Sequence, residues 1–416
     1  EKYVDSIKHY NENRYQSWYK KLNDSDKGLK NQWHQINLDR TSWEIAKMPS
    51  LWSTFDPNMK PGAIWMHKSF NVNKKQVGKA VRLFLGCIVD ADSVYINGQF
   101  VGTTSYQYPP RKYDIPASLL KEGLNEITIR VIDENGRGGF VKDKPYEFVF
   151  KDKSKIKLEG EWLYKVGCEV NKIEPHIFIQ WKPLGLYNAM IHPLFHYPIK
   201  GVLWYQGESN VGKPQEYYGL MDELIGNWRT GFGNAELPFY YAQLANFLEE
   251  KEMPVESNWA SLRQQQLNMQ KIPNTGMAVS IDIGEWNDIH PLNKKDVGER
   301  LALHALKNQY AKKDIIVSGP LVKKYKVNKN KVTLEFDFVQ NGLQKVDSLK
   351  YFELAGENKK FAKAVAIIKG KSIVLQSDEI AAPKYVRYAW ADNPEGVNFF
   401  NTDRLPASPF ELKLDF

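Results

Sequence analysis

Two short stretches of polar residues in this sequence are suited to acid–base chemistry. In the first, Asp288 precedes His290 by two residues, within Asp-Ile-His-Pro. A histidine that takes a proton from a hydroxyl and returns it to a leaving group needs a carboxylate that holds the imidazole tautomer and stabilises the imidazolium. One loop with this spacing can supply both groups. By spacing alone, an aspartate that caps a turn beside a surface histidine is commoner, and Asp282, at the end of the preceding expected strand, is a rival acid.

The second stretch is Gly201-Val-Leu-Trp-Tyr-Gln-Gly-Glu-Ser-Asn210, an apolar run that ends in a polar loop. A tetrahedral intermediate of acyl transfer needs hydrogen-bond donors aimed at its oxyanion. The amide side chains of Gln206 and Asn210 and the backbone N–H of Gly207 can supply such donors at a strand end. The alternative is a polar turn that caps the following helix at Ser209 or Asn210.

Ser209 follows an expected strand and is therefore a candidate nucleophile. A nucleophile elbow has the pattern Gly-x-Ser-x-Gly, and Gly207-Glu-Ser209 lacks the second glycine. We therefore expect a structural or capping role for Ser209.

The histidines and cysteines show no metal-ligand spacing. His192 and His196 are four residues apart, but Pro193 lies between them and no glutamate accompanies them as in H-E-x-x-H. Cys87 lies in an apolar run, which predicts a buried small hydrophobe, and two cysteines, Cys87 and Cys168, do not fix the redox compartment. We expect no metal and no cofactor.

Length and charge restrict the class of protein. A chain of 416 residues exceeds one ordinary core, so two or three domains are expected. The sequence has 57 basic and 49 acidic residues, and its net charge of +8 is spread along the chain. No nucleic-acid-binding motif accompanies this charge, so we expect no nucleic-acid partner. No apolar run reaches the roughly 18 residues that span a bilayer, so we expect no membrane span.

Residue patterns divide the chain into four segments. In residues 1–40, aromatic and aliphatic residues recur at helical spacing, which predicts one or two surface helices. Residues 41–150 contain short β-rich runs between turn signals such as Asn97-Gly98, which predict a sandwich or jelly roll. Residues 311–416 return to strand-like runs, which predict a C-terminal β-sandwich.

Residues 151–310 alternate between strand and helix patterns. We expect strands at Ile199–Gln206, Phe239–Ala245 and Gly276–Ile283, and helices at Pro214–Arg229, Ser257–Gln270 and Lys294–Gln309. This order predicts a parallel sheet covered on both faces, with its chemistry beyond the carboxyl ends of the strands. Both polar stretches directly follow expected strands, where this rule places an active site.

These blocks resemble those of the SGNH hydrolases, and among them the sialate O-acetylesterase family. The resemblance rests on the Trp-Tyr-Gln-Gly-Glu-Ser-Asn string, on Asp-Ile-His-Pro, on Pro183-Leu-Gly-Leu-Tyr-Asn-Ala-Met-Ile191 and on a Leu-Arg-x-x-Gln segment, and it continues through Val386-Arg-Tyr-Ala-Trp390 and Leu405-Pro-Ala-Ser-Pro-Phe410. Residues 41–150 resemble the galactose-binding-like domain of β-galactosidases in Asp92-Ser-Val-Tyr-Ile-Asn-Gly98, Val101-Gly102, Tyr113-Asp-Ile-Pro116 and Gly123-Leu-Asn125.

The family resemblance implies a role for each polar residue. His290 would be the base and Asp288 the acid that orients it. The oxyanion and other polar groups of the active site would come from Gln206, Gly207, Glu208 and Asn210.

Four further residues would bind substrate. Arg263 and Gln266 lie one helical turn apart and share a face, so they would bind a sugar carboxylate or buttress the site; a salt bridge on the helix surface is the alternative for Arg263. Tyr187 and Asn188 would line the cleft, with a core position for Tyr187 and a turn or cap position for Asn188 as the alternatives.

The sequence departs from the family pattern at the nucleophile. Family members carry the serine on a Gly-Gln-Ser-Asn turn and a Gly-Gly-Thr oxyanion loop, upstream of the position at which Glu1 falls, and neither string occurs here. A sheet without its first strands has an unpaired inner edge. We therefore expect an N-terminal fragment of the same protein to supply the serine, or the chain to be inactive.

The sequence therefore predicts an α/β protein: a flavodoxin-like SGNH hydrolase three-layer domain, incomplete here, with an inserted β jelly roll and a C-terminal β-sandwich. Residues 1–40 would belong to the SGNH domain, residues 41–150 to the jelly roll, residues 151–310 to the SGNH domain again, and residues 311–416 to the sandwich. The expected function is removal of O-acetyl groups from sialic acids, in the periplasm or outside the cell. The alternatives are a non-catalytic carbohydrate-binding protein and an acetylxylan-type esterase.

Overall fold

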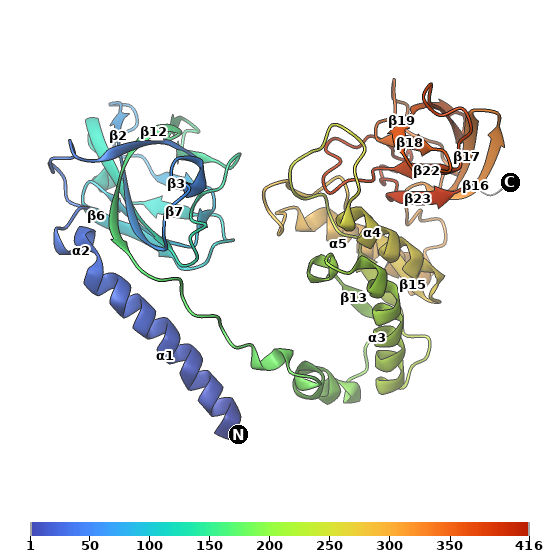
Figure 1. Cartoon of the computed structure of the whole chain (residues 1–416), viewed down its shortest axis with the longest axis horizontal. Coiled ribbons are helices and arrows are strands. Elements are labelled where there is room, and N and C mark those ends of the chain that lie inside the picture. Colours follow the sequence, from blue (N-terminus) through green and yellow to red (C-terminus); the bar gives the residue numbers. More distant parts are fainter. Residues whose placement is uncertain (1, 415–416) are drawn as a thin grey trace. The chain divides into compact units, whose positions relative to one another are not determined.

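The computed structural model describes residues 2–414, which divide into two units, one ending at Gly185 and the other beginning at Leu186 (Figure 1). It is a mixed α/β structure with one small parallel sheet and several antiparallel sheets, which confirms the predicted class at this level. In this part of the chain, no helix is both long and apolar enough to cross a membrane.

The first unit contains a β-sandwich. One sheet has the order β1-β12-β2-β8-β5-β6 and the other the order β11-β10-β3-β7, with a small extra pair β4-β9. The side chains of Leu83, Ile127 and Ile129 have no exposed surface, because alternate residues of each strand face the opposing sheet. The strands are β1 (Glu44–Met48), β2 (Gly62–Val72), β3 (Val81–Leu85), β4 (Ile88–Val89), β5 (Ala91–Ile96), β6 (Gln99–Thr104), β7 (Lys112–Ile115), β8 (Gly123–Asp133), β9 (Gly139–Phe140), β10 (Tyr146–Phe150), β11 (Lys155–Lys157) and β12 (Gly160–Glu169).

Two N-terminal helices, α1 (Lys2–Ser25) and α2 (Lys27–Lys30), pack on this sandwich. Asp26, between them, is fully buried and accepts a hydrogen bond from the backbone N–H of Gly28 at 2.7 Å. It also accepts hydrogen bonds from Trp65 Nε1 at 3.0 Å and from Arg130 Nε at 2.7 Å. One carboxylate therefore fixes the helices to strands β2 and β8.

The sandwich extends further along the chain than the sequence indicates. Strand β12 lies between β1 and β2, so the β-domain runs to Glu169, past the predicted boundary at residue 150. The pattern of residues 151–170 is compatible with either neighbouring domain, and the strand pairing decides between them. The assignment of residues 1–40 to the SGNH domain, and the insertion of the β-domain into it, stay predictions.

The second unit begins with the parallel sheet that the alternating pattern predicted. Its strands β13 (Val202–Trp204), β14 (Phe239–Ala242) and β15 (Thr275–Ala278) lie in chain order. Each is followed by a helix: α3 (Tyr217–Gly231), α4 (Asn258–Asn268) and α5 (Lys294–Asn308). The helices agree with the prediction within about one turn. The strands are shorter than predicted, because their last residues leave the ladder for polar loops.

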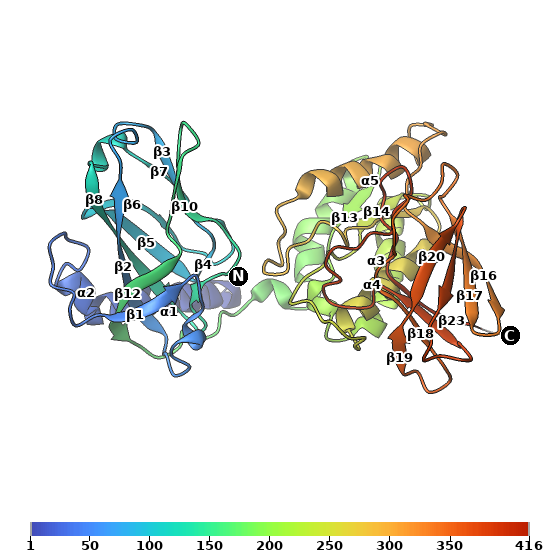
Figure 2. The same cartoon turned by 90° about the horizontal axis from the view of Figure 1, so that it is seen from above.

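The sheet has helices on both faces (Figure 2). Phe239 and Tyr241 of β14 belong to the core shared with α3 and α4, whereas Tyr240 and Ala242 pack with α5. This alternation follows from the two-residue period of a strand, and it explains why β14 is apolar along its whole length.

The C-terminal segment forms the predicted sandwich of two antiparallel sheets. Leu334 and Leu375 from one sheet and Leu354 and Val386 from the other have no exposed surface and share one core. The first sheet has the order β16 (Leu321–Asn328), β17 (Lys331–Asp337), β21 (Ser372–Gln376) and β20 (Val365–Lys369), and the second has the order β19 (Phe361–Lys363), β18 (Phe352–Ala355), β22 (Tyr385–Tyr388) and β23 (Phe410–Lys413).

Candidate active site

The loops after the three parallel strands carry most of the predicted site residues. Gln206–Asn210 follow β13, and the loop that contains Asp288 and His290 follows β15. Because parallel strands end at the same edge of a sheet, these loops emerge together, as the sequence predicts.

Hydrogen bonds to the side chain and to the backbone carbonyl of Gln206 hold the Gln206 loop in place. The side-chain Nε2 of Gln206 donates to Oδ1 of Asn210 at 2.7 Å. Its carbonyl oxygen accepts from the hydroxyl of Tyr217 at 2.8 Å and from Nε2 of Gln266 at 3.3 Å. These contacts fix the direction in which the amide of Gln206 points.

Gly207 lies where a side chain does not fit. A Cβ at this position would come within 2.9 Å of Leu262 Cδ2 and 3.2 Å of Gln266 Nε2. Glycine therefore lets the loop backbone lie close to Leu262 and Gln266 of helix α4.

Glu208, Ser209 and Asn210 form a single 3-10 turn, in which the side chain of Ser209 is exposed. Helix α3 begins only at Tyr217, after a second short turn, Pro214–Glu216. The capping alternative for Ser209 or Asn210 does not hold for α3, because neither residue adjoins the helix, and the structural role expected for Ser209 stays a prediction.

Arg263 and Gln266 lie on the inner face of α4, with exposed fractions of 0% and 1%. The Gln266 side chain accepts from the N–H of Leu244 at 2.9 Å while it donates to Gln206, so it ties the loops after β13 and β14 together. Burial lowers the pKa of the Arg263 guanidinium.

The guanidinium of Arg263 is enclosed by four backbone carbonyls, those of Leu244, Ala245, Ala391 and Asp392, at 2.6 to 2.9 Å. A group with no exposed surface cannot meet a sugar carboxylate. The structure therefore favours the buttressing role, and it excludes the predicted alternative of a salt bridge on the helix surface.

The Asp288 loop combines a buried carboxylate with an exposed histidine. Asp288 has an exposed fraction of 6%, and its Oδ1 accepts from the backbone N–H of His290 at 2.9 Å, whereas the His290 side chain is exposed. Glu285 braces the loop, because its carbonyl accepts from the N–H of Asp288 at 3.2 Å and its carboxylate accepts from the N–H of Leu292 at 2.8 Å.

The rival acid, Asp282, has another partner. Its two oxygens accept from the guanidinium of Arg300 at 2.6 and 2.7 Å, and the same guanidinium also donates to the carbonyl of Val279. This bidentate pair fixes α5 to the end of β15. Asp288, which shares a loop with His290, is the better candidate for the acid.

Two contacts bring the loops together. Nζ of Lys294, at the start of α5, lies 5.5 Å from the ring centroid of Tyr205, and the N–H of Leu248 donates to the carbonyl of Trp286 at 2.8 Å. Burial, with a contribution from Glu208, raises the pKa of Tyr205 to about 12. The phenol of Tyr205 therefore stays neutral at ordinary pH and can donate a hydrogen bond but not act as a base.

Tyr187 and Asn188 lie elsewhere. Tyr187 contacts Phe195, with 6.0 Å between ring centroids, and Phe195 contacts Phe232 at the carboxyl end of α3. Tyr217, which bonds to the Gln206 loop, is at the other end of this 15-residue helix, which is about 22 Å long. The structure does not bring this pair to the Gln206 loop, and it supports the packing alternative for half-buried Tyr187.

The sequence did not identify the residues that hold these loops in place. Tyr217, Glu285 and Arg300 contact the loops directly. The only local signal was for Glu285, a carboxylate three residues before Asp288 in the same polar loop.

Residues 176–307 match the family model described as carbohydrate esterase, sialic acid-specific acetylesterase. This segment belongs to the sialic acid-specific acetylesterase family. The match includes the three parallel strands and every site residue from Tyr187 to His290. The family model thus covers the part of the chain in which the two polar loops meet.

Curated members with similar sequences are the sialate O-acetylesterases of Mus musculus and Homo sapiens. The mouse protein is 31% identical over 252 residues, which cover 54% of this chain and 46% of that protein. The human protein is 32% identical over 253 residues, which cover 54% and 48%. The chain therefore spans about half the length of the curated acetylesterases that it matches.

A solved structure resembles a larger part of the chain. The crystal structure of a carbohydrate acetylesterase from Xanthomonas citri aligns with a TM-score of 0.53 at 25% identity, and the alignment covers 85% of this chain and 96% of that one. The similarity therefore extends beyond the segment that the acetylesterase family model matches.

Proposed function

We propose that this protein is a carbohydrate O-acetylesterase that removes acetyl groups from O-acetylated sialic acids. The observation that carries the proposal is the exposed His290 beside buried Asp288, on a strand-end loop next to the Gln206–Asn210 loop. The match of residues 176–307 to a sialic acid-specific family supports the choice of sugar. An acetylxylan-type substrate would use the same machinery.

The reaction proposed is acyl transfer through a serine. His290 takes the proton of the serine hydroxyl while its oxygen attacks the acetyl carbonyl, and donors of the Gln206 loop stabilise the oxyanion. The intermediate collapses, and the sugar oxygen leaves with the proton from His290. Water, deprotonated by His290, then attacks the acetyl-serine, which releases acetate and restores the serine. Asp288 orients His290 and stabilises its charged form.

We propose that the serine comes from a segment outside these 416 residues, which packs against the free edge of β13. Within the described residues, β13 pairs with β14 on one side only. Leu203, in the middle of β13, has an exposed fraction of 65%, and Tyr197, just before the strand, 67%. Further strands that cover this edge would bury these side chains, as in a flavodoxin-like three-layer SGNH domain.

The test compares two proteins on p-nitrophenyl acetate and on O-acetylated sialic acid. One is the verified 416-residue chain, and the other is the same chain with the upstream segment of its own gene. We expect acetate release only from the longer protein, and its loss in a His290→Ala variant. Full activity of the 416-residue chain would refute the proposal that the serine comes from another segment, and Ser209 would again be a candidate nucleophile. An inactive longer protein that folds would refute the esterase proposal.

A further inference from the structure

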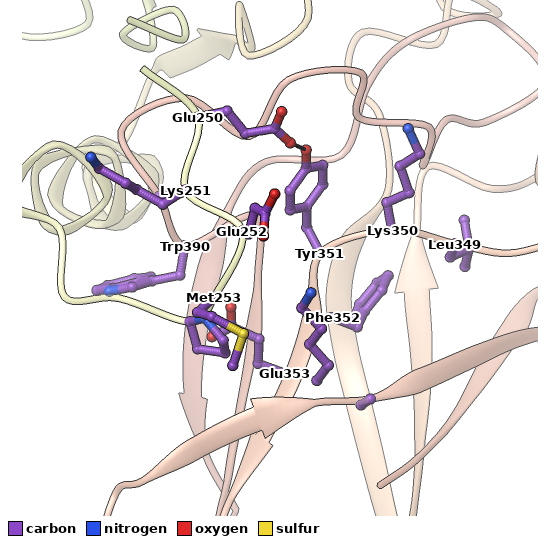
Figure 3. A pocket seen from close by; sticks show the side chains of 14 residues that line it. Glu250, Lys251, Glu252, Met253, Leu349, Lys350, Tyr351, Phe352, Glu353 and Trp390 are labelled. Carbon is purple, nitrogen blue, oxygen red and sulfur yellow. Dashed lines mark hydrogen bonds between the residues drawn. The ribbon is translucent and has the colours of Figure 1, made fainter. Parts of the chain in front are cut away.

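A cavity lies in the unit that begins at Leu186, between the loop after β14 and the C-terminal sandwich (Figure 3). Its volume is about 520 Å³, which is in the range of small-molecule sites. Glu250 and Met253 of the loop line one side, and Tyr351, Glu353 and Trp390 line the other.

The loop is fixed over the sandwich. The hydroxyl of Tyr351 donates hydrogen bonds to the carboxylate of Glu250, drawn as a dashed line in Figure 3, and to the carbonyl of Glu395 at 2.6 Å. The N–H of Phe247, where the loop begins, donates to the carbonyl of Asp392 at 3.2 Å. These contacts hold the loop against the sandwich on one side of the cavity.

Two polar atoms of the cavity wall have no partner among the described residues. Oε2 of Glu353 and Nε1 of Trp390 are both buried without a hydrogen bond. Glu353 has an exposed fraction of 8% and Trp390 of 6%. A buried acceptor or donor without a partner is destabilising, so such atoms are rare in folded proteins unless a ligand or water satisfies them.

The neighbour that would be expected to pair with Glu353 is occupied elsewhere. Arg387 lies opposite Glu353 across strands β18 and β22. Its guanidinium donates to both oxygens of Glu256 at 2.9 and 3.1 Å and to Glu411 at 2.6 Å, and it lies 4.6 Å from the ring centroid of Trp390. Arg387 therefore leaves Oε2 of Glu353 without a hydrogen bond, and Lys363, which lies opposite Glu353 across strands β18 and β19, supplies none to this atom.

The chemistry of the wall favours a neutral polyol. Three carboxyl groups line the cavity, from Glu250, Glu252 and Glu353, and three ammonium groups, from Lys251, Lys350 and Lys363, so the formal charges cancel when Glu353 is ionised. Neither a cation nor an anion is favoured by net charge. A hydroxyl can both donate to a carboxylate and accept from an indole N–H.

We propose that this cavity binds one neutral sugar residue, with a hydroxyl that donates to Glu353 and accepts from Trp390. The site goes beyond the proposed esterase function and is separate from the Asp288 loop. Its position suits a glycan-holding role, because the loop that covers it also contacts the active-site loop through Leu248 and Trp286.

The experiment measures binding of methyl β-galactoside, methyl β-glucoside and N-acetylglucosamine to the 416-residue chain by saturation-transfer NMR and calorimetry. We expect saturable binding of at least one of them. At pH 8, where Glu353 is ionised, Glu353→Gln should weaken it by about tenfold, because a charge-assisted hydrogen bond is lost. Trp390→Phe, which keeps the ring and removes the donor, should weaken it as well and serves if the first variant does not fold. Glu335→Gln, on the exposed face of β17, is the matched control and should bind as the parent chain does.

Two outcomes would overturn the proposal. One is the absence of saturable binding for all three sugars. The other is binding that His290→Ala abolishes and Glu353→Gln leaves unchanged, because the sugar would then occupy the active site. Since the readout is binding and not hydrolysis, failure of the esterase proposal would leave this result interpretable.

Discussion

The β-domain and the parallel sheet each contain a polar cluster built around an aspartate. In the β-domain, Asp92 and Arg111 form an ion pair at 2.6 Å with no exposed surface on either side chain, and Tyr113 donates to Asp92 at 2.5 Å. At the sheet edge, Asp288 is nearly as buried, but the residue that it supports, His290, is exposed.

The two clusters differ in whether a polar group is left accessible to a substrate. In the β-domain cluster, Arg111 also donates to the carbonyls of Asp90 and Pro109, so every charged group has an internal partner. Such a cluster can contribute specificity to the fold but has no group to offer a substrate. The Asp288 loop combines a fixed carboxylate with a histidine that can reach a ligand, which is the arrangement that catalysis requires.

The largest expected effect is the loss of turnover when the residues of the Asp288 loop are replaced. In the longest active form of the protein, His290→Ala should lower kcat by on the order of a thousandfold or more, since triad members act as a unit. Asp288→Asn should cost somewhat less, and stability in urea should change little in either variant. The comparison variant is Asp282→Asn, which breaks the pair with Arg300: if it lowered turnover per folded molecule more than Asp288→Asn, Asp288 would not be the acid.

The β-domain cluster should show the opposite behaviour. Asp92→Asn leaves a buried guanidinium without its counter-charge, so the free energy of unfolding should fall by about 3 to 5 kcal/mol. Turnover per folded molecule should stay unchanged. Asp114→Asn, which breaks an exposed pair with Arg82 in the same domain, is the control and should change stability little. Equal effects of the two changes in urea unfolding would contradict this account.

Substitutions in the Gln206 loop test whether its hydrogen-bond donors contribute to turnover in addition to His290. Gln206→Ala should lower kcat roughly a hundred- to a thousandfold with little change in KM, because an oxyanion donor acts in the transition state. Ser209→Ala, in the next turn of the same loop, should keep most of the activity. The reverse order in steady-state kinetics would show that the roles within this loop are wrongly assigned.

A smaller effect concerns Glu353, whose pKa burial raises to about 7. The unfolded chain loses this proton near pH 4.5, whereas the folded chain keeps it to about pH 7, so stability falls as the pH rises through this window. Glu353→Gln should remove the loss and be more stable than the parent at pH 8 but not at pH 4. Thermal unfolding at both pH values measures this, and an unchanged difference between the two would contradict it.

The local patterns predicted the elements well, because the parallel strands are apolar throughout and the helices have clear ends. Ser257, for example, caps α4 by accepting from the N–H of Ala260. The same rule, polar loops after parallel strands, placed Gln206 and His290 in strand-end loops, where the structure has them, and their roles stay predictions. These features depend on neighbours in the sequence.

Other features depend on partners far along the chain, which no local pattern contains. Arg263 has the same spacing to Gln266 whether their helical face is exposed or buried, and burial depends on the carbonyl of Ala391, 128 positions away. Tyr187 lies away from the Gln206 loop, because it packs against Phe195, which in turn packs on Phe232. The place of β12 between β1 and β2 is likewise set by pairing and not by composition.

The carbonyls around Arg263 bear on how freely the parts of this protein can be exchanged. Two of them belong to the loop after the central strand of the parallel sheet, and two to the chain that leaves the C-terminal sandwich. A recombinant that joins this sheet to a sandwich from another source would leave the guanidinium in an apolar interior with half of its acceptors missing. The sandwich is therefore not an interchangeable module, and the two parts are expected to be inherited together.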